Sequence, residues 1–439
     1  MRRRAVRCEN SQTERDAVKL AFVTPRYGAD LTTGPEHACR LLAEHIGHRH
    51  DVDVLTTCAR DARTWKNEYP EGPDRMRGVR VRRFPVTERE PDPSALDRLA
   101  TRLLGEPHSR AEEHDWVRRK GPWAPGLLDH LKRQHRNYDA LVFFGLMTAT
   151  TVFGLPVAPE HSVLFPHLDL KPTLRLSLWP ELLLMPRALG LLSTSERRVL
   201  HSFMRVQPHH EELVGIGIEP SPQHTYPRHQ QDPSDVVPTE DDVPGDNEPA
   251  AEEPYNSGRG APFRRRHRLY GPIALYGGRV EPGNGCQEML EYFDGYASTD
   301  GDVSLVLMGV KMMQVPDEPY LRQAGMLPDR ERMIAFEAAD VTIAPAPDDL
   351  LAQSVLESMA VGTPVLASAR NVSAVAHCRR ANAGLFYENR EEFVEMLRLI
   401  ARNSELRERL GDAGRRYVEQ HYRWDAVIGR FERLIGRVR

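Results

Sequence analysis

The sequence predicts an α/β protein with two parallel-sheet domains, and three observations lead to this fold class. The chain has 439 residues, more than one ordinary hydrophobic core accommodates, so we expect two domains of similar size. Short apolar runs alternate with segments of helical spacing in both halves, as in open parallel sheets with flanking helices. Residues 219–262 separate the halves, because this proline-rich and acidic stretch has too little apolar surface to offset the entropy of folding. We interpret it as a disordered insertion or linker.

The first half begins with a strand, a helix and a second strand, which together form one βαβ unit. A short apolar run spans residues 18–25, apolar positions recur at helical spacing over 34–47, and residues 51–57 are rich in Val and Thr. The same alternation continues to residue 218. We predict further strands at 79–86, 140–145 and 162–167, with an intervening helix at 127–135.

The second half repeats this alternation and ends in two helices. We predict strands at 272–278, 303–309, 340–346 and 363–368, with helices at 287–296, 330–339 and 354–362 between them. Apolar positions at helical spacing then predict two amphipathic helices in residues 404–438. The predicted parts are a tail at 1–16, a first domain at 17–218, the linker at 219–262, a second domain at 263–415 and a final helix at 416–439.

Composition excludes several classes of function. The chain has 59 Lys and Arg against 63 acidic residues, and its net charge of -4 gives no global attraction to nucleic acid or anionic lipid. Its five cysteines are scattered and odd in number, which argues against a disulfide framework or a structural zinc site. No apolar segment follows the basic amino terminus, so secretion is not expected. We predict a cytoplasmic protein with no nucleic-acid partner, metal or cofactor; the sequence does not identify its oligomeric state.

Two stretches raise the question of membrane contact. Residues 140–159 carry no charge over a length that can span a bilayer, but their Thr, Gly and Pro content favours a buried strand at 140–144 that runs into a helix. The basic run at 264–268 is most simply a solvated helix, and the alternative is a patch that touches an anionic membrane surface. Peripheral membrane association is therefore the alternative to a purely cytoplasmic location.

A glycine-rich turn in the second half is a candidate ligand site. Ligands of open α/β sheets bind at the carboxyl ends of the strands, where loops lead into helices. Gly278 and Arg279 follow a predicted strand there, and Asn284 and Gly285 precede a helix. Glycine lets the backbone approach a ligand, and a guanidinium can hold a diphosphate by paired hydrogen bonds. Taken alone, such a turn is at least as often only a turn.

Two acids eight residues apart form a second candidate. Asp349 lies in the loop after the strand at 340–346, and Glu357 lies in the helix that follows. A carboxylate can accept two hydroxyl hydrogen bonds, so one acid could hold a ribose and the other a sugar. The alternative is that Asp349 caps the helix and Glu357 is a solvated helix residue.

Four segments, in order, resemble retaining glycosyltransferases of family 4, also described as glycosyl transferases group 1. The segments are PRYGADLTTGPEHACRLLAEHI, GGRVEPGNG, the Asp349-x7-Glu357 motif followed by SMAVGTPVLAS, and AGRRYVEQHYRWD. The resemblance extends over most of the chain outside residues 219–262. It implies the GT-B architecture, in which two Rossmann-like parallel-sheet domains face a central cleft and the last helix crosses back to the first domain.

The resemblance also implies an activity, namely transfer of a sugar, of the hexosyl type, from a nucleotide-activated donor to an acceptor hydroxyl. The departing phosphate would help to deprotonate the acceptor on the same face, and domain closure would exclude water. Arg279 and Asp349 are the catalytic candidates. Arg279 would hold the leaving diphosphate, Asp349 would face the donor sugar and Glu357 would hold the ribose.

Other positions are assigned to the two sides of the implied cleft. Gly278, Asn284 and Gly285 complete the donor loop. The loop from Gly28 to Gly34 would approach the donor phosphate or the acceptor from the other domain, and the segment FPHLDLKP places His167 and Asp169 on the acceptor side.

Three positions depart from the family pattern. Asn284 stands where a lysine is expected, Asp349 replaces a glutamate, and Thr33-Gly34 replaces a double glycine. Loss of one preorganised group that stabilises transition-state charge costs on the order of 100- to 1,000-fold in rate. The alternative function is therefore a weakened or inactive relative that acts as a binding or assembly partner. Another GT-B activity on sugar nucleotides, such as epimerisation, would need acid/base residues that we do not locate.

Overall fold

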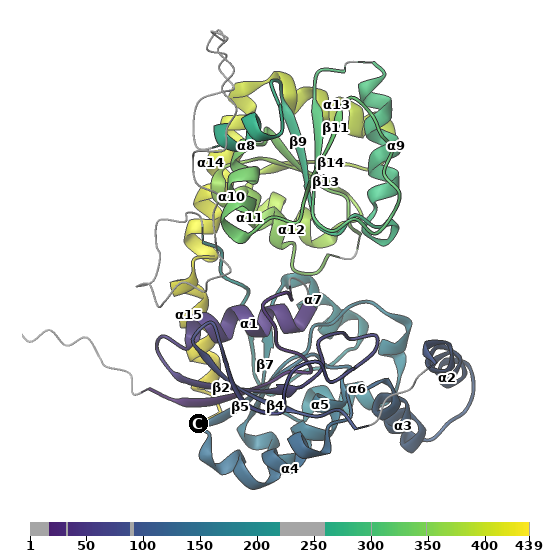
Figure 1. Ribbon diagram of the computed structural model, residues 1–439, viewed down its shortest axis with the longest axis vertical. Coiled ribbons are helices and arrows are strands. Elements are labelled where there is room, and N and C mark those ends of the chain that lie inside the picture. The colour runs from purple at the N-terminus through teal and green to yellow at the C-terminus, as the bar shows by residue number, and fades with distance from the viewer. Residues whose placement is uncertain are drawn as a thin grey trace, which may run out of the picture.

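The protein folds into two α/β domains, seen in a computed structural model that describes residues 17–31, 34–87, 92–219, 260–299, 301–347 and 349–438 (Figure 1). The predicted tail at 1–16 and nearly all of the predicted linker at 219–262 lie outside the described residues. Two parallel-sheet α/β domains were predicted, and this fold class is confirmed.

The amino-terminal domain contains an eight-stranded sheet in the order β3-β4-β2-β1-β5-β6-β7-β8. All neighbouring strands are parallel except β3 and β4, which form an antiparallel pair at one edge. The strands are β1 (Lys19–Val23), β2 (Asp51–Thr57), β3 (Gly72–Met76), β4 (Val79–Phe84), β5 (Ala140–Phe144), β6 (Ser162–Phe165), β7 (Ala188–Leu191) and β8 (Glu211–Leu213). The helices are α1 (Gly34–Ile46), α2 (Pro93–Gly105), α3 (Arg110–Lys120), α4 (Pro125–Gln134), α5 (Ala149–Gly154), α6 (Leu178–Leu184) and α7 (Thr194–Arg198).

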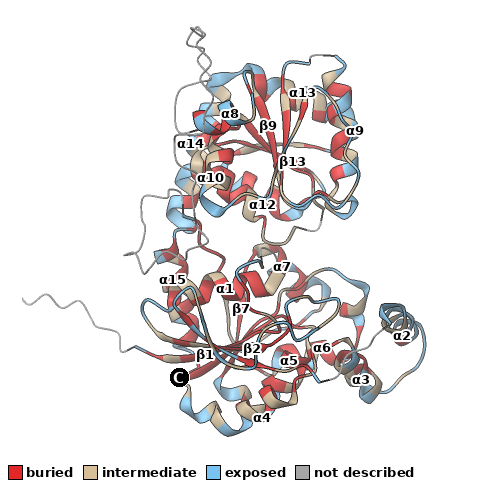
Figure 2. Ribbon diagram, in the orientation of Figure 1, coloured by how far each residue is buried: buried red, intermediate tan, exposed pale blue. Residues whose placement is uncertain are grey.

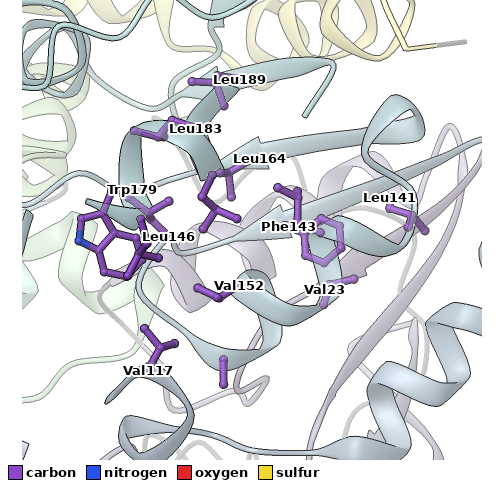
Figure 3. Packing of buried hydrophobic residues seen from close by; sticks show 14 of the residues in the cluster. Val23, Val117, Leu141, Phe143, Leu146, Val152, Leu164, Trp179, Leu183 and Leu189 are labelled. Carbon is purple, nitrogen blue, oxygen red and sulfur yellow. The ribbon is translucent and has the colours of Figure 1, made fainter. Parts of the chain in front are cut away.

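This sheet is buried on both faces, as parallel sheets are. In β5, Leu141 and Phe143 pack into one apolar cluster, with helices α3 to α6, whereas Val142 and Phe144 pack into a second cluster with α1. Figure 3 shows part of the first cluster, where Leu141 and Phe143 lie near Val23. A continuous apolar run therefore marks these strands, since both side-chain directions are covered (Figure 2).

The carboxyl-terminal domain contains a six-stranded parallel sheet in the order β11-β10-β9-β12-β13-β14. Its strands are β9 (Ile273–Gly277), β10 (Ser304–Met308), β11 (Leu321–Gly325), β12 (Val341–Ala344), β13 (Val365–Ser368) and β14 (Gly384–Tyr387). Its helices are α8 (Ala261–Arg266), α9 (Cys286–Ala297), α10 (Asp329–Ala338), α11 (Gln353–Val361), α12 (Val372–Ala381), α13 (Arg390–Arg402) and α14 (Ser404–His421).

The last helix, α15 (Trp424–Ile435), returns to the amino-terminal domain. Helices α14 and α15 run along one side of the molecule, from the upper domain to the lower one in Figure 1. The apolar face of α15 lies in the same cluster as α1 and β5, and Phe431 packs against Phe22 and Phe165 with ring centroids 5.9 and 6.2 Å apart. His45 of α1 stacks on Trp424 at 3.5 Å.

The structure corrects the interpretation of the basic run at 264–268. Arg264 is only 7 % exposed, and its guanidinium pairs with Asp340 at 2.9 Å and donates to the Gly271 carbonyl at 2.8 Å. The run is therefore not a uniformly solvated helix, because its first arginine fastens α8 to the sheet. Separately, no helix among the described residues is long and apolar enough to cross a membrane.

Candidate functional site

The donor loop predicted after β9 is held by hydrogen bonds to its own backbone. The carbonyl of Arg279 accepts from the Tyr276 hydroxyl at 2.8 Å and from the side-chain amide of Asn284 at 2.9 Å. The Gly278 N–H donates to the carbonyl oxygen of Met308, at the end of β10, at 2.9 Å. Asn284, which stands where the family pattern has a lysine, thus braces the backbone of Arg279.

The charged side chain of Arg279 lies at the surface of this loop. The Arg279 guanidinium is 51 % exposed and lies 3.1 Å from the Glu281 carboxylate, so a ligand would compete only with an exposed ion pair. Gly285 begins α9 with φ +70°, and a Cβ there would lie 2.8 Å from the Pro345 carbonyl oxygen. Glycine is therefore required where this loop packs on the segment after β12.

Asp349 is held by the backbone of the loop before α11. Its Oδ1 accepts from the backbone N–H of Ala352 at 2.9 Å. Burial raises the pKa of Asp349, opposed by the N–H groups of Ala352 and Leu351 and by the charge of His167. Burial likewise raises the pKa of Tyr276, with a smaller contribution from the charge of Asp349. Asp349 therefore binds the N–H of the residue that precedes α11, and no described side chain caps the first turn of that helix.

His167 comes from the opposite domain and lies among carboxylates. Its backbone has φ +55°, and its Nε2 is 3.7 Å from Oδ1 of Asp169, which also pairs with Lys171 at 2.9 Å. The buried Glu196 accepts from the backbone of Leu168 at 3.1 Å, and burial raises the pKa of Glu196 while the charge of His167 opposes that shift. Asp169 and Glu196, both of the amino-terminal domain, therefore lie close to this histidine.

Glu357 is a buried helix residue, which excludes the solvated alternative. It is 7 % exposed, Oε2 forms an ion pair with Arg332 of α10, and Oε1 accepts from the Gln353 amide nitrogen at 3.1 Å. Burial raises the pKa of Glu357, and Arg332 is the largest opposing cause. Since carboxylate oxygens together offer about four acceptor positions, two remain after these contacts.

Gln353 connects this acid to the amino-terminal domain. Its Oε1 lies 3.1 Å from Nε2 of His37, the fourth residue of α1. His37 is 4 % exposed, and burial followed by the charge of Arg40 lowers its pKa to about 4. The contacts of its ring nitrogens with the Leu31 carbonyl oxygen, at 2.9 Å, and with Gln353 oppose that shift of the pKa. Sequence reasoning missed His37, Gln353 and Arg332, because only the packing of α1, α10 and α11 brings them together.

The loop from Gly28 to Gly34 precedes α1 and is fastened by ion pairs. Asp30 pairs with Arg60 at 2.9 Å, and Arg26 pairs with Glu36 at 2.9 Å. Gly34 has φ +81°, and a Cβ on Gly28 would lie 2.7 Å from an Asp30 carboxylate oxygen. Thr33 lies outside the described residues.

A further contact joins the domains between α7 and α12, which face one another in Figure 1. The hydroxyls of Ser195 and Ser373 lie 2.8 Å apart, and Ser373 also lies 3.1 Å from the Leu350 carbonyl oxygen. The structure therefore links Glu357 to α1 through Gln353, and it packs the Arg279 loop on the segment after β12.

Two hollows on the described surface lie elsewhere. One of about 530 Å³ is lined by residues from Arg197 to Glu211, and one of about 300 Å³ lies between the end of α2 and residues 175–177. Neither is lined by a predicted site residue. Within the described ranges, no group of three His, Cys, Asp or Glu side chains is arranged to hold a metal ion.

The chain is similar to known glycosyltransferases in two ways. Residues 262–417 match the family described as Glycosyl transferases group 1. Solved structures match over nearly the whole chain at low identity. They include sucrose-phosphate synthase from Thermosynechococcus elongatus, with 15% identity, a TM-score of 0.62 and coverage of 95% of this chain and 98% of that one.

The HepE protein of Anabaena gives further matches. Its complex with UDP has 12% identity and a TM-score of 0.65, covering 95% of this chain and 100% of that one. Its complex with UDP-glucose has 13% identity and a TM-score of 0.62, covering 95% and 98%. No curated protein sequence matches this chain. The two sheets and these likenesses establish the GT-B architecture of this chain.

Proposed function

We propose that this chain is a retaining glycosyltransferase of family 4, which moves a sugar from a nucleotide-activated donor to an acceptor hydroxyl. The supporting observation is the close approach of the loops after β9 and β12, where a Cβ on Gly285 would lie 2.8 Å from the Pro345 carbonyl oxygen, together with the contact of Gln353 with His37 of the other domain. A donor site in this fold is expected at such loops, which lie at the carboxyl ends of parallel strands. The match of residues 262–417 to group 1 transferases supports a transferase function.

The side chains have distinct roles in this proposal. Arg279 exchanges its exposed contact with Glu281 for the donor diphosphate and stabilises the charge that develops there. Glu357 accepts hydroxyl hydrogen bonds of the ribose. The leaving phosphate takes the proton of the acceptor hydroxyl on the face where the new bond forms, so the anomeric configuration is retained. We propose that no metal takes part, and transfer should then persist in EDTA.

One observation favours the second candidate, a relative that binds a partner without catalysis. Asp349 already accepts from Ala352, and Asn284 is engaged with the Arg279 carbonyl, so neither replaces the missing lysine or glutamate in an evident way. A protein of this kind would keep the fold and the domain contact while lacking transfer.

Calorimetric titration with uridine, guanosine and adenosine diphosphates tests the proposal. We expect binding of at least one nucleotide and its weakening in Glu357→Ala. Absence of binding to all three would contradict the proposal. Donor hydrolysis and transfer by wild type and Asn284→Lys then separate the two candidates. Faster turnover in the variant indicates a weakened enzyme, whereas no turnover in either indicates the partner role.

A further inference from the structure

A continuous set of polar contacts links the Glu357 carboxylate to the opposite domain. Arg332 pairs with Oε2, the Gln353 amide nitrogen donates to Oε1 at 3.1 Å, and Gln353 Oε1 faces His37 Nε2 at 3.1 Å. Glu357 and His37 are both more than nine-tenths buried. Buried polar groups such as these two are costly unless each has a partner, so the geometry around them is specific.

The direction of each hydrogen bond follows from the charge of Glu357. An ionised carboxylate is acceptor-only, so Gln353 must present its nitrogen to Glu357 and its oxygen to His37. His37 Nε2 then donates to Gln353, while its Nδ1 lies 2.9 Å from the carbonyl oxygen of Leu31, which can only accept. Both ring nitrogens of His37 therefore face acceptor oxygens, and both can donate at once only in the protonated ring; Arg40 lies 3.3 Å from Nδ1. Arg40 also lies 3.4 Å from the Leu31 carbonyl oxygen.

We propose that Arg332, Gln353 and His37 are positioning residues that hold the Glu357 carboxylate for the vicinal hydroxyls of the donor ribose and couple that recognition to the contact between the domains. This inference rests on the proposed function. Arg332 and Gln353 each fill one acceptor position and leave two, the number that a ribose 2′,3′-diol requires. His37 holds the Gln353 amide in place, so a weaker contact between the domains also leaves the Glu357 carboxylate less firmly positioned.

The test compares uridine, guanosine and adenosine diphosphates with their 2′-deoxy counterparts by calorimetric titration of the full chain. For the wild type we expect the ribonucleotide to bind about 10-fold or more tightly, because the lost hydrogen bond has a charged acceptor. Gln353→Leu and His37→Leu should bring this ratio close to one. His37→Gln, which keeps a side-chain N–H for Gln353, should retain more of it. Arg332→Met should lower the ratio, whereas Arg330→Met, an exposed arginine of the same helix, should not.

The ratio distinguishes positioning from a structural role, since general destabilisation weakens both nucleotides alike. Equal ratios in wild type, Gln353→Leu and His37→Leu would overturn the inference and leave nucleotide binding intact. A wild type that binds nucleotides without preferring the ribose would overturn it too. Failure of the wild type to bind any of them refutes the proposed function itself. If a leucine variant does not fold, Gln353→Ala and His37→Ala take its place, because a ratio unchanged in both refutes the inference.

Discussion

Removal of the Arg332 guanidinium is expected to destabilise the carboxyl-terminal domain in a way that depends on pH. Arg332→Met leaves the Glu357 carboxylate buried with only the Gln353 amide as a partner. A buried carboxylate without its cation takes up a proton instead of remaining charged. The free energy needed to protonate Glu357 is therefore the largest electrostatic loss of stability that Arg332→Met can cause.

The magnitude follows from the ordinary pKa of a glutamate, 4.5. Neutralising such a group at pH 7 costs about 3 kcal/mol, and at pH 5 about 0.7 kcal/mol, at 1.36 kcal/mol per unit. The pKa of Glu357 is raised in the folded protein, so the folded state binds more protons and stability falls as pH rises through that window. Loss of Arg332 raises the pKa of Glu357 further, so stability decreases more steeply with pH.

Hydrogen exchange of the α11 amides between pH 5 and pH 8 measures this effect, because two domains need not unfold in a single step. After correction for the intrinsic exchange rate, the difference between wild type and Arg332→Met should grow with pH. The double variant Arg332→Met/Glu357→Gln has no buried charge and should show little pH dependence. An equal loss at pH 5 and pH 8 would refute the reasoning, since a packing defect does not titrate.

Three other substitutions test separate parts of the structure. Burial, and next the charge of Lys171, lowers the pKa of Lys120 to about 8. The unfolded chain therefore binds more protons above that pH, and the free energy of unfolding should rise between pH 8 and pH 10. Lys120→Met should raise the free energy of unfolding in urea at pH 7 by at most about 3 kcal/mol and abolish its rise between pH 8 and pH 10. No gain at pH 7 would contradict this. Gly285→Ala adds left-handed strain of about 1–2 kcal/mol and a contact with the Pro345 carbonyl, so nucleotide binding by titration should weaken; unchanged affinity would show that the turn is not part of the site. Phe431→Ala should cost the amino-terminal domain about 3–5 kcal/mol in denaturation, and a loss below about 1 kcal/mol would mean that α15 is not part of that core.

The elements that the sequence predicts best are those with a strong local signal. The strand at 140–144 matches β5 because all five side chains are apolar and covered on both faces. By contrast, β8 (Glu211–Leu213) has no apolar run, and the apolar run of β7 is interrupted by Gly190, which has a low strand propensity, so neither was predicted. The antiparallel pairing of β3 with β4 also escaped, since Gly72–Met76 contains a proline and two charged residues.

Prediction of the site has a different limit. Arg279 and Glu357 could be singled out because a motif places them after strands, whereas His37 and Arg332 are ordinary polar residues on amphipathic helices. Their partners are 316 and 25 residues away in sequence. No periodic pattern in the sequence predicts such a pairing. The residues of a buried ion pair also look the same in sequence as those of a solvated one. The same limit explains why Arg264 was assigned to solvent.

The two acids of the motif have different roles at α11, Asp349 in the loop before the helix and Glu357 within it. Ala352, with φ +46°, begins α11 without a side-chain cap of its own, and Asp349 supplies the acceptor for its N–H. Because Asp349 reaches its own helix start, it orders the turn that presents Gln353 to His37. Glu357 lies one turn further on and keeps free acceptor positions. Asp349 thus orders the start of the helix, and in the proposed donor site the ribose and the diphosphate are left to Glu357 and Arg279.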